Sequence, residues 1–484
     1  MEISVIGAGY VGLTTAACLA ELGHNILCAD RAMEKLELLK AGGVPFYEPH
    51  LTEIVRRNHA TGRLEFTSTE QAIDGCEVLF ICVGTPPLEN GEADLWAIEH
   101  LARVIAQRAR GYRLIIEKST VPVQTGRQLQ RHLALYSAND LQYDVVSNPE
   151  FLREGCAVED FFHPDRIVVG AETRRAADLL KRVYAPILDQ SFVCPVHQPV
   201  CARREAVPLL LTDINSAELI KHASNSFLAM KISFINMVAD LCEAAHGDIK
   251  RVAEGIGLDR RIGPAFLRPG IGFGGFCFPK DLQAFIRIAE KFGCDFSLLA
   301  EVERINQRRV DLFLEKAKRE LWVLRGKTIA VWGLAFKPDT DDTRFAPSLG
   351  IIQRLLAEGC KVRAYDPQAM ANARKQYPEV TYCENIYEAA QSAAAILILT
   401  EWDEFRTVEW PRLRAVVDRP VLIDGRNMFS REEVLSHGFL YSGMGVPTAR
   451  QKDILADLPD WSKLSAESAA RQEHAEQISH GQMV

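Results

Sequence analysis

The stretch GFGGFCFPKD, residues 272–281, brings a thiol, a cation and a carboxylate close together along the chain. Cys277 is followed by Lys280 and Asp281, and the preceding glycines would let a ligand approach the backbone closely. We expect nearby cations to lower the pKa of the Cys277 thiol and make it a nucleophile. A cysteine taken alone is more often a buried structural residue. The chemistry therefore depends on which reactive groups accompany it.

Two further pairs of polar residues are spaced four apart, and in a helix, as we expect for Lys221 and Asn225, this spacing places both members on one face. Lys221 and Asn225 lie in AELIKHASN, and Glu150 and Glu154 lie in NPEFLRE. Each could singly be an ordinary solvated residue. Their occurrence together with the thiol stretch indicates one site that combines a thiol, an ammonium, an amide and carboxylates.

A nucleotide-binding pattern opens the chain. Residues 3–30 predict a strand, a glycine turn, a helix and a second strand. Gly7, Gly9 and Gly12 form GxGxxG at the start of the helix, where unpaired N–H groups favour a pyrophosphate. Asp30, at the end of the second strand, would accept from a ribose 2′-hydroxyl and repel a 2′-phosphate. The pattern predicts NAD rather than NADP, and the alternative is a packing turn that binds nothing.

A thiol beside NAD has a natural use. When a primary alcohol is oxidised to an aldehyde, a thiolate can add to it, and the thiohemiacetal can lose a second hydride to give a thioester. Water then releases a carboxylate. The combination suggests a four-electron oxidation of an alcohol to an acid within one site.

The secondary-structure elements that must position these groups are typical of an α/β protein. Short apolar strands alternating with helices predict a parallel, doubly wound sheet, whose ligands bind beyond the carboxyl ends of the strands. The pattern resumes after Arg325 without a second GxGxxG. We predict two Rossmann-like doubly wound domains joined by a long central helix. The expected parts are residues 1–210 (NAD-binding), 211–310 (central helical, carrying catalytic residues), 311–449 (second Rossmann-like) and 450–484 (a mobile tail).

The central helix is predicted from Asp213 onward by apolar residues at alternating steps of three and four. These residues are Ile220, Ala223, Phe227, Met230, Phe234, Met237 and Leu241. The seam fits either a helix that spans the core or a subunit interface, and the pattern alone favours neither.

Composition excludes other classes. A net charge of −8 argues against nucleic acid as the main partner, and the apolar runs are too short to span a membrane. The chain begins directly as a strand, so we expect a cytoplasmic protein without a leader. The 12 cysteines show no CxxC pair and no Cys/His cluster of zinc spacing, so no metal is expected.

With these stretches in place, residues 1–445 resemble the UDP-glucose/GDP-mannose dehydrogenase family. The resemblance is carried by GAGYVGL, VPFYEPHL, VGTPP, EKSTVPV, SNPEFLREG, AELIKHASNSFLAMKISFIN, RIGPAFLRPGIGFGGFCFPKD and GLAFKPDTDDTR. Features after ST and around NPEF favour the UDP-glucose branch. The resemblance implies oxidation of UDP-glucose to UDP-glucuronate for polysaccharide precursors, by a homodimer built on the central helix with UDP in the second Rossmann-like domain.

The resemblance also implies roles for individual residues. The catalytic set would be Cys277 as nucleophile, Lys221 and Asn225 holding the reacting oxygen, Asp281 and Thr120 in proton removal, and Glu150 as the base for thioester hydrolysis. The NAD contacts would be Gly7, Gly9, Val11, Gly12, Asp30, Lys35, Thr85, Thr120, Glu154, Lys280 and Arg344. The sugar nucleotide would lie along Glu150, Phe151, Leu152, Arg153, Glu154, Lys221, Asn225, Phe266, Leu267, Arg268, Pro269, Gly270, Gly274 and Lys337, with Arg261 supplied by the neighbouring subunit.

Alternatives are the same chemistry on GDP-mannose or a UDP-N-acetylhexosamine, a two-electron β-hydroxyacid-type dehydrogenase, and a non-catalytic NAD sensor. The chain also departs from the family pattern. Phe276 stands where a small polar residue is usual, Phe345 stands where an acid is common, and residues 197–213 form a longer stretch than usual.

Overall fold

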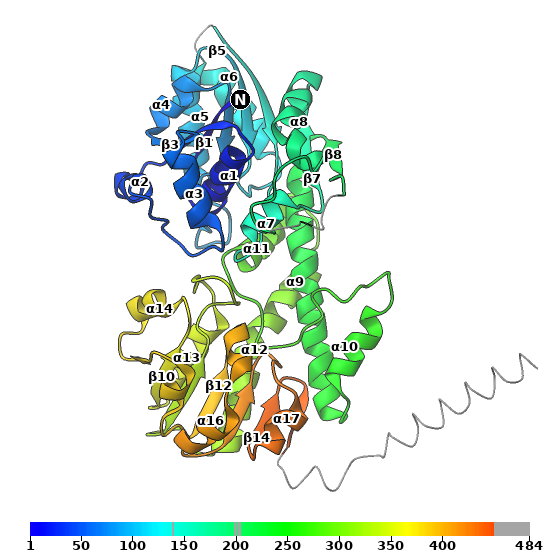
Figure 1. Cartoon of the computed structure of the whole chain (residues 1–484). Coiled ribbons are helices and arrows are strands. Elements are labelled where there is room, and N and C mark those ends of the chain that lie inside the picture. Colours follow the sequence, from blue (N-terminus) through cyan, green and yellow to red (C-terminus); the bar gives the residue numbers. More distant parts are fainter. Residues whose placement is uncertain (138–139, 198–200, 202–204, 450–484) are drawn as a thin grey trace, which may run out of the picture.

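Two sheets connected by a group of central helices make up the protein (Figure 1). The structure is a computed structural model, which describes residues 1–137, 140–197, 201 and 205–449. The predicted tail over 450–484 therefore lies outside the described residues. The first sheet and its helices occupy the top of Figure 1, the second sheet lies at the bottom, and the helix α9 runs alongside both.

The first sheet has eight strands in the described part of the chain, in the order β3-β2-β1-β4-β5-β6-β7-β8. Its strands are β1 (Glu2–Ile6), β2 (Asn25–Ala29), β3 (Leu64–Thr67), β4 (Val78–Ile81), β5 (Gly111–Glu117), β6 (Leu141–Ser147), β7 (Ile167–Ala171) and β8 (Leu209–Thr212). The helices are α1 (Tyr10–Glu21), α2 (Met33–Lys40), α3 (Leu51–Ala60), α4 (Thr69–Gly75), α5 (Trp96–Arg108), α6 (Thr125–Tyr136), α7 (Ala157–Phe162) and α8 (Arg174–Leu188). The order 3-2-1-4-5-6 is that of a dinucleotide-binding sheet.

Three strands depart from the parallel pattern expected from the sequence: β7 and β8, which are parallel to each other, run opposite to the other strands of the first sheet, and the last strand of the second sheet is antiparallel to its neighbour. β7 runs antiparallel to β6, pairing Val146 with Ala171 and Ser147 with Gly170. The chain between these strands holds only the short α7, which reverses it instead of crossing over the sheet. This excursion leaves residues 150–156 at the carboxyl end of β6, where ligands of such sheets bind.

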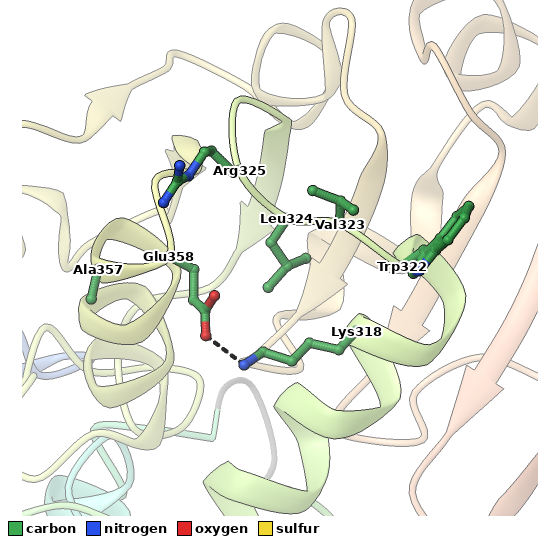
Figure 2. Close-up of a pocket in the computed structure, with 7 residues that line it drawn as sticks. All are labelled: Lys318, Trp322, Val323, Leu324, Arg325, Ala357 and Glu358. Carbon is green, nitrogen blue, oxygen red and sulfur yellow. Dashed lines mark hydrogen bonds and ion pairs between the residues drawn. The ribbon is translucent and has the colours of Figure 1, made fainter.

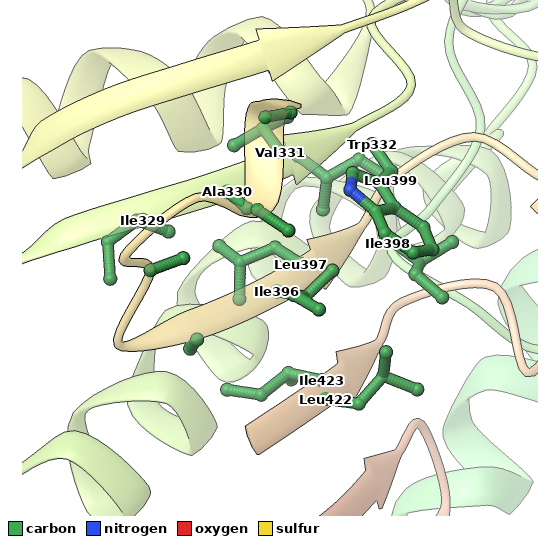
Figure 3. Packing of buried hydrophobic residues seen from close by; sticks show 14 of the residues in the cluster. Ile329, Ala330, Val331, Trp332, Ile396, Leu397, Ile398, Leu399, Leu422 and Ile423 are labelled. Atoms are coloured by element: carbon green, nitrogen blue, oxygen red, sulfur yellow. The ribbon is translucent and has the colours of Figure 1, made fainter. Parts of the chain in front are cut away.

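The second sheet repeats the arrangement in the order β11-β10-β9-β12-β13-β14-β15. Its strands are β9 (Thr328–Trp332), β10 (Lys361–Tyr365), β11 (Thr381–Tyr382), β12 (Ala395–Ile398), β13 (Val421–Asp424), β14 (Leu440–Gly443) and β15 (Val446–Ala449). The helices are α13 (Pro347–Ala357), α14 (Met370–Gln376), α15 (Ile386–Ala390), α16 (Trp410–Val416), α17 (Arg431–Ser436) and the 3-10 helix η1 (Asp403–Thr407). Figure 3 shows apolar side chains of β9, β12 and β13 packed together, with the buried Trp332 at one side of the group beside Ile398 and Leu399.

Four helices lie between the sheets along the chain: α9 (Ile214–Ala244), α10 (Ile249–Gly257), α11 (Cys277–Lys291) and α12 (Ser297–Leu321). α9 has 31 residues, which makes it about 46 Å long at 1.5 Å per residue. It begins where predicted, because Asp213 caps it and accepts from the Ser216 N–H at 2.9 Å.

α9 packs against both sheets. A Cβ added to Gly170 of β7 would lie 2.7 Å from the Ala217 Cβ, and one added to Gly445, beside β15, would lie 2.6 Å from the Ala239 Cβ. Both glycines thus allow the helix to approach closely. The predicted class of two Rossmann-like domains joined by a long helix is confirmed. Within the described ranges, no helix is long and apolar enough to cross a membrane.

Candidate active site

The turn between β1 and α1 gives each glycine of the GxGxxG pattern a separate role. Gly7 has φ +105°, and a Cβ there would lie 2.5 Å from the Cys82 carbonyl oxygen. A Cβ on Gly12 would lie 1.7 Å from the Gly7 oxygen, whereas one on Gly9 would meet nothing within 4 Å. Gly7 and Gly12 therefore allow the turn to form, and Gly9 leaves the amino end of α1 open to an anionic ligand.

Asp30 lies directly beside this turn at the end of β2. Its Oδ2 accepts from the Ala8 N–H at 2.9 Å and from Lys35 Nζ at 2.8 Å. Burial alone would raise the pKa of Asp30, but Lys35 and the backbone N–H groups outweigh it and hold the pKa below its ordinary value. The group is a fixed carboxylate at neutral pH, suited to ribose hydroxyls and repulsive to a 2′-phosphate.

The remaining predicted NAD residues of the first sheet follow neighbouring strands. Thr85, after β4, donates from Oγ1 to the Thr120 carbonyl oxygen, after β5, at 2.8 Å. This bond joins the two loops at one edge of the sheet. Val11, in the first turn of α1, is partly exposed.

A buried ion pair lies next to this edge. Lys221 of α9 donates from Nζ to Glu150 Oε1 over 2.8 Å, and both side chains are about 5% exposed. Burial would lower the pKa of Lys221, but Glu150, Asp281 and Cys277 together raise it above its ordinary value. Lys221 is therefore a permanent cation in a water-poor site, able to stabilise an oxyanion.

A second polar pair lies one turn further along α9. Asn225 Nδ2 donates to Asp281 Oδ2 over 2.6 Å, and Lys280 Nζ lies 2.8 Å from Asp281 Oδ1. Burial would raise the pKa of Asp281, but Lys280, His222 and Lys221 hold it below its ordinary value. The structure thus brings the spaced pair Lys221 and Asn225 of α9 together with Asp281 of α11.

Cys277 is the first residue of α11 and is partly exposed. Its thiol shares electrostatic interactions with Asp281, Glu150 and Lys221, which places it in the same cluster. The expectation of a lowered thiol pKa is wrong for this arrangement. Burial, followed by Asp281 and Glu150, raises the pKa of Cys277 to about 12, and Lys221 offsets only part of the rise. The resting group is a neutral thiol.

The glycine-rich loop before Cys277 is held by side chains that sequence reasoning did not single out. Asn236 of α9 accepts from the Gly270 N–H at 2.8 Å, and Arg309 of α12 donates to the Gly270 oxygen at 3.1 Å. Asn306 accepts from the Phe273 N–H at 2.8 Å and donates to its oxygen at 2.9 Å. The sequence could have indicated that Asn236 and Asn306 hold this loop only if the position of the loop in the fold had been known.

Residues 150–156 are fastened by another residue that sequence reasoning missed. Glu48 accepts from the backbone N–H of Gly155 at 2.7 Å and of Ala157 at 2.6 Å, and the Tyr10 hydroxyl also donates to it. The carboxylate thereby caps α7 and connects that helix to the amino end of α1. Its only signal was the YEP stretch, which carried no assigned role.

The second domain reaches the first through Arg344. Its Nη2 lies 3.4 Å from Glu154 Oε1 and 2.6 Å from Asp342 Oδ2. Burial and Asp342 raise the pKa of Glu154 to about 8. The aromatic ring of Phe276 makes cation–π contacts with two basic side chains: the Arg344 guanidinium lies 4.4 Å and Lys280 Nζ 5.5 Å from the ring centroid.

Other predicted substrate residues lie around this junction. Phe151 has the Arg166 guanidinium 3.7 Å from its ring centroid and Lys221 Nζ at 5.4 Å. A Cβ on Gly274 would lie 2.4 Å from the Phe345 oxygen, so the glycine is required for that contact. Lys337 acts electrostatically on Glu154 across the same junction. Of the rest, Phe266, with φ +65°, and Leu152 are partly exposed, while Leu267 and Pro269 are buried.

Three predicted residues are exposed within one chain, and two of them form ion pairs outside the site. Arg153 forms a bidentate pair with Asp160 of α7, Arg268 is exposed, and Arg261 is exposed and paired with Asp259. A separate pocket, shown in Figure 2, is lined by the ends of α12 and α13 around the Lys318–Glu358 ion pair. Its lining includes none of the predicted site residues.

These features define the class of the protein as a nucleotide-dependent dehydrogenase of two α/β domains. They are a glycine turn of the dinucleotide-binding type, a second Rossmann-like sheet, and a thiol surrounded by ammonium, amide and carboxylate groups.

Comparison with known proteins narrows this class. The chain matches the models of the UDP-glucose/GDP-mannose dehydrogenase family for the NAD binding domain over residues 1–188, the central domain over 215–308 and the UDP binding domain over 330–431. It is 42% identical over 451 residues to UDP-glucose 6-dehydrogenase TuaD of Bacillus subtilis (93% of this chain, 94% of that protein). It is 43% identical over 454 residues to UDP-glucose 6-dehydrogenase of Rhizobium meliloti (92% and 100%).

A solved UDP-glucose dehydrogenase from Pyrobaculum islandicum is 37% identical, with a TM-score of 0.82, covering 92% of this chain and 98% of that one. The chain belongs to the UDP-glucose/GDP-mannose dehydrogenase family.

Proposed function

We propose that this protein oxidises UDP-glucose to UDP-glucuronate, consuming two NAD and one water for each sugar nucleotide. Its relatives that are about 40% identical over nearly their whole length are named for the oxidation of UDP-glucose. The overall change is alcohol plus two NAD⁺ plus water giving carboxylate, two NADH and three protons. A solved relative at 26% identity is a UDP-D-ManNAc dehydrogenase, so other sugar nucleotides belong in the test.

The observation that carries the proposal is the position of Cys277. It begins α11 within the cluster formed by Lys221, Glu150, Asn225 and Asp281. A two-electron alcohol dehydrogenase has no use for a thiol in that position. A four-electron oxidation needs one, because the aldehyde must be held between the two hydride transfers.

When bound, NAD accepts the hydride in each of the two oxidations. In the first, Lys221 and Asn225 hold the oxygen on the reacting carbon, and its proton passes toward Asp281, aided by Thr120. The Cys277 sulfur then bonds to the aldehyde carbon while the thiol proton moves to the aldehyde oxygen, giving a thiohemiacetal. Once Asp281 has released the first proton to water, the hydroxyl proton of the thiohemiacetal passes toward it, and Lys221 stabilises the charge on that oxygen as the second hydride leaves.

Hydrolysis completes the cycle. Loss of the second hydride leaves a thioester on Cys277. Glu150 takes a proton from water, the water oxygen bonds to the thioester carbon, and the C–S bond breaks with the sulfur regaining a proton. Since Glu150 is 2.8 Å from Lys221 in the resting structure, the lysine must turn to the oxyanion before the carboxylate can act as a base.

We assign the two nucleotides to the two sheets. NAD binds at the β1–α1 turn, with Asp30 and Lys35 at its ribose and with Thr85, Glu154, Lys280 and Arg344 among its contacts. The uridine nucleotide binds the second domain, and residues 150–154, 266–270, Gly274 and Lys337 contact the sugar nucleotide. The corresponding units are residues 1–210, 211–310 and 311–449.

We further infer a homodimer built on α9. The helix presents its polar residues inward, whereas Phe227, Phe234, Met237 and Leu241 are 49–67% exposed. A contiguous apolar face of this kind marks an interaction surface. A partner on this face would also explain the exposure of Arg261, which would complete the neighbouring site. A cytoplasmic location follows from the need to keep the Cys277 thiol reduced, and polysaccharide precursor supply is the role suited to the product.

The test is to incubate the protein with NAD and a panel of sugar nucleotides and to count NADH formed per sugar consumed. UDP-glucose should give two NADH, and GDP-mannose and UDP-N-acetylhexosamines should give little turnover. One NADH per UDP-glucose would exclude the thioester route. Cys277→Ser should stop after the first oxidation or at a slowly hydrolysed ester, and full two-step turnover in that variant would exclude the nucleophile. NADP in place of NAD should be a poor substrate because of Asp30.

A further inference from the structure

Four side chains outside the active site converge at the end of α7. They are His163, Cys194, His197 and Cys201, whose donor atoms all lie within 4.8 Å of one another. His163 follows α7 directly, and the other three belong to the excursion between α8 and β8. Both cysteines are buried, and both histidines are partly buried. A spacing of Cys-x₂-His-x₃-Cys, with the fourth residue 31 positions upstream, is not a paired-cysteine pattern.

The nitrogen–sulfur separations in this cluster match those of a tetrahedral zinc shell. His163 Nε2 lies 3.2 Å from Cys194 Sγ and 3.4 Å from Cys201 Sγ. His197 Nδ1 lies 3.5 Å from each of the same two sulfurs. Bonds of about 2.3 Å to sulfur and 2.0–2.1 Å to nitrogen place the nitrogen and sulfur ligands of tetrahedral zinc about 3.5 Å apart. Each ring nitrogen faces both sulfurs nearly equally, which a single N–H···S bond would not require.

The outer nitrogens of both rings are anchored so that an acceptor atom faces the centre. His163 Nδ1 lies 2.8 Å from Gln190 Oε1. The orientation of that amide is fixed, because its Nε2 donates to the oxygens of Phe162 at 3.0 Å and Ile187 at 2.8 Å. His163 therefore carries its proton on Nδ1 and turns the Nε2 lone pair toward the thiols. Such second partners are typical of metal-binding histidines.

His197 follows the same logic. Its Nε2 lies 3.5 Å from Glu159 Oε1 of α7. A carboxylate near the outer nitrogen favours the tautomer that carries the proton there, which leaves Nδ1 as the electron-pair donor toward the thiols. One nitrogen of each imidazole ring thus turns its lone pair toward both cysteine sulfurs, which lie at nearly equal distances from it.

We propose that His163, Cys194, His197 and Cys201 bind one zinc ion in a closed, tetrahedral Cys₂His₂ site. Two thiolates and two imidazoles match the ligand preference of zinc, and four protein ligands leave no open position for chemistry. The ion ties the excursion after α8 to the end of α7. Since α7 begins directly after residues 150–156, the zinc site holds from one end the helix that Glu48 holds from the other.

The sequence has no Cys/His cluster of zinc spacing along the chain, but the fold brings two scattered cysteines and two histidines together in space. The longer stretch noted before α9 begins within this excursion. Two of the four residues, His197 and Cys201, lie in that stretch.

The experiment uses the full chain, purified without chelators or affinity metals and dialysed against metal-free buffer. Elemental analysis should find about one zinc per chain. Cys194→Ser and Cys201→Ser should each lower this to below about a tenth of an equivalent, whereas Cys294→Ser, at an exposed thiol outside the cluster, and Cys277→Ser should keep it. Replacement of zinc by cobalt in the unmutated chain should give the intense visible bands of tetrahedral cobalt and a thiolate charge-transfer band.

The cobalt spectrum keeps the test decisive if a serine variant fails to fold, because it needs no mutation. Less than about a fifth of an equivalent of metal after incubation with zinc would overturn the proposal. So would cobalt bands of octahedral type, full zinc content in both cysteine variants, or a disulfide between Cys194 and Cys201 detected by mass spectrometry. None of these readouts depends on turnover, so the proposed oxidation can fail while the zinc site stands, and the reverse.

Discussion

Replacing Glu150 by glutamine should make the Cys277 thiol easier to ionise and therefore faster to alkylate. Burial, Asp281 and Glu150 raise the pKa of this thiol to about 12, and Lys221 acts in the opposite direction. In the resting structure Lys221 is paired with Glu150 at 2.8 Å. The substitution removes one anion near the sulfur and also leaves the ammonium of Lys221 without its carboxylate partner.

The expected size follows from the ionised fraction. At pH 8 a thiol of pKa 12 is about 0.01% thiolate, whereas an ordinary cysteine of pKa 8.5 is about 20% thiolate. Cys277 should therefore react on the order of a thousandfold more slowly than an exposed thiol. A charged neighbour within a few ångströms shifts a pKa by about one to three units, so Glu150→Gln should accelerate alkylation by roughly tenfold to a thousandfold.

The assay is the rate of iodoacetamide modification of Cys277 between pH 6.5 and 10.5, resolved by mass spectrometry of the modified peptide. Cys294, which is exposed, is a reference within the same chain, and Glu150→Asp is the matched control because it keeps the charge. The wild-type rate should still be rising at pH 10. A plateau near pH 8.5, or a Glu150→Gln rate equal to that of the wild type, would refute the electrostatic reasoning.

Three further predictions concern the nucleotide turn, the core and the subunit contact. A Cβ on Gly9 would meet nothing within 4 Å, so Gly9→Ala should leave the free energy of unfolding close to that of the control Gly255→Ala but weaken NAD binding at least tenfold by calorimetry. Gly12→Ala should instead destabilise the fold by about 1–3 kcal/mol or more. Equal stability of the Gly9→Ala and Gly12→Ala variants would contradict the packing argument. Burial raises the pKa of Glu117 to about 8, so the folded chain keeps a proton that the unfolded chain releases near pH 4.5. Wild-type stability in denaturant titrations should then fall by up to about 1.4 kcal/mol per pH unit between pH 5 and 8, and Glu117→Gln should flatten that dependence; an unchanged slope would refute it. Phe234→Glu, on the exposed apolar face of α9, should convert a dimer to a monomer in analytical ultracentrifugation, and a variant that stays dimeric would place the interface elsewhere.

Local patterns in the sequence were sufficient for the elements and for the residues that start or end them. The glycines of residues 7–12 predicted the turn, and Asp213 predicted the start of α9, because capping and chain reversal depend on neighbours in sequence. The pairing of Lys221 with Glu150 was not predictable in the same way. The sequence showed each as a member of a spaced pair, but only the antiparallel return of β7 and the packing of α9 bring the two together.

What sequence reasoning missed is long-range in each case. Glu48 is 107 positions from the Gly155 N–H that it accepts, and Asn306 is 33 positions from Phe273. The direction of the Cys277 pKa shift also depends on which groups the fold places around the thiol. The sequence showed lysines nearby, whereas the fold buries the thiol and places two carboxylates around it.

The close contacts of α9 with both sheets determine how far apart the two sheets lie. The Ala217 contact with the first sheet and the Ala239 contact beside the second are separated by 22 residues, or roughly 33 Å. Inserting one residue between them would lengthen the helix by about 1.5 Å and rotate one end relative to the other by about 100°. Lys221 and Asn225 would then leave the site, or Ala239 would leave Gly445. The length and the helical phase of α9 between these two points are therefore fixed by the distance and orientation between the two sheets.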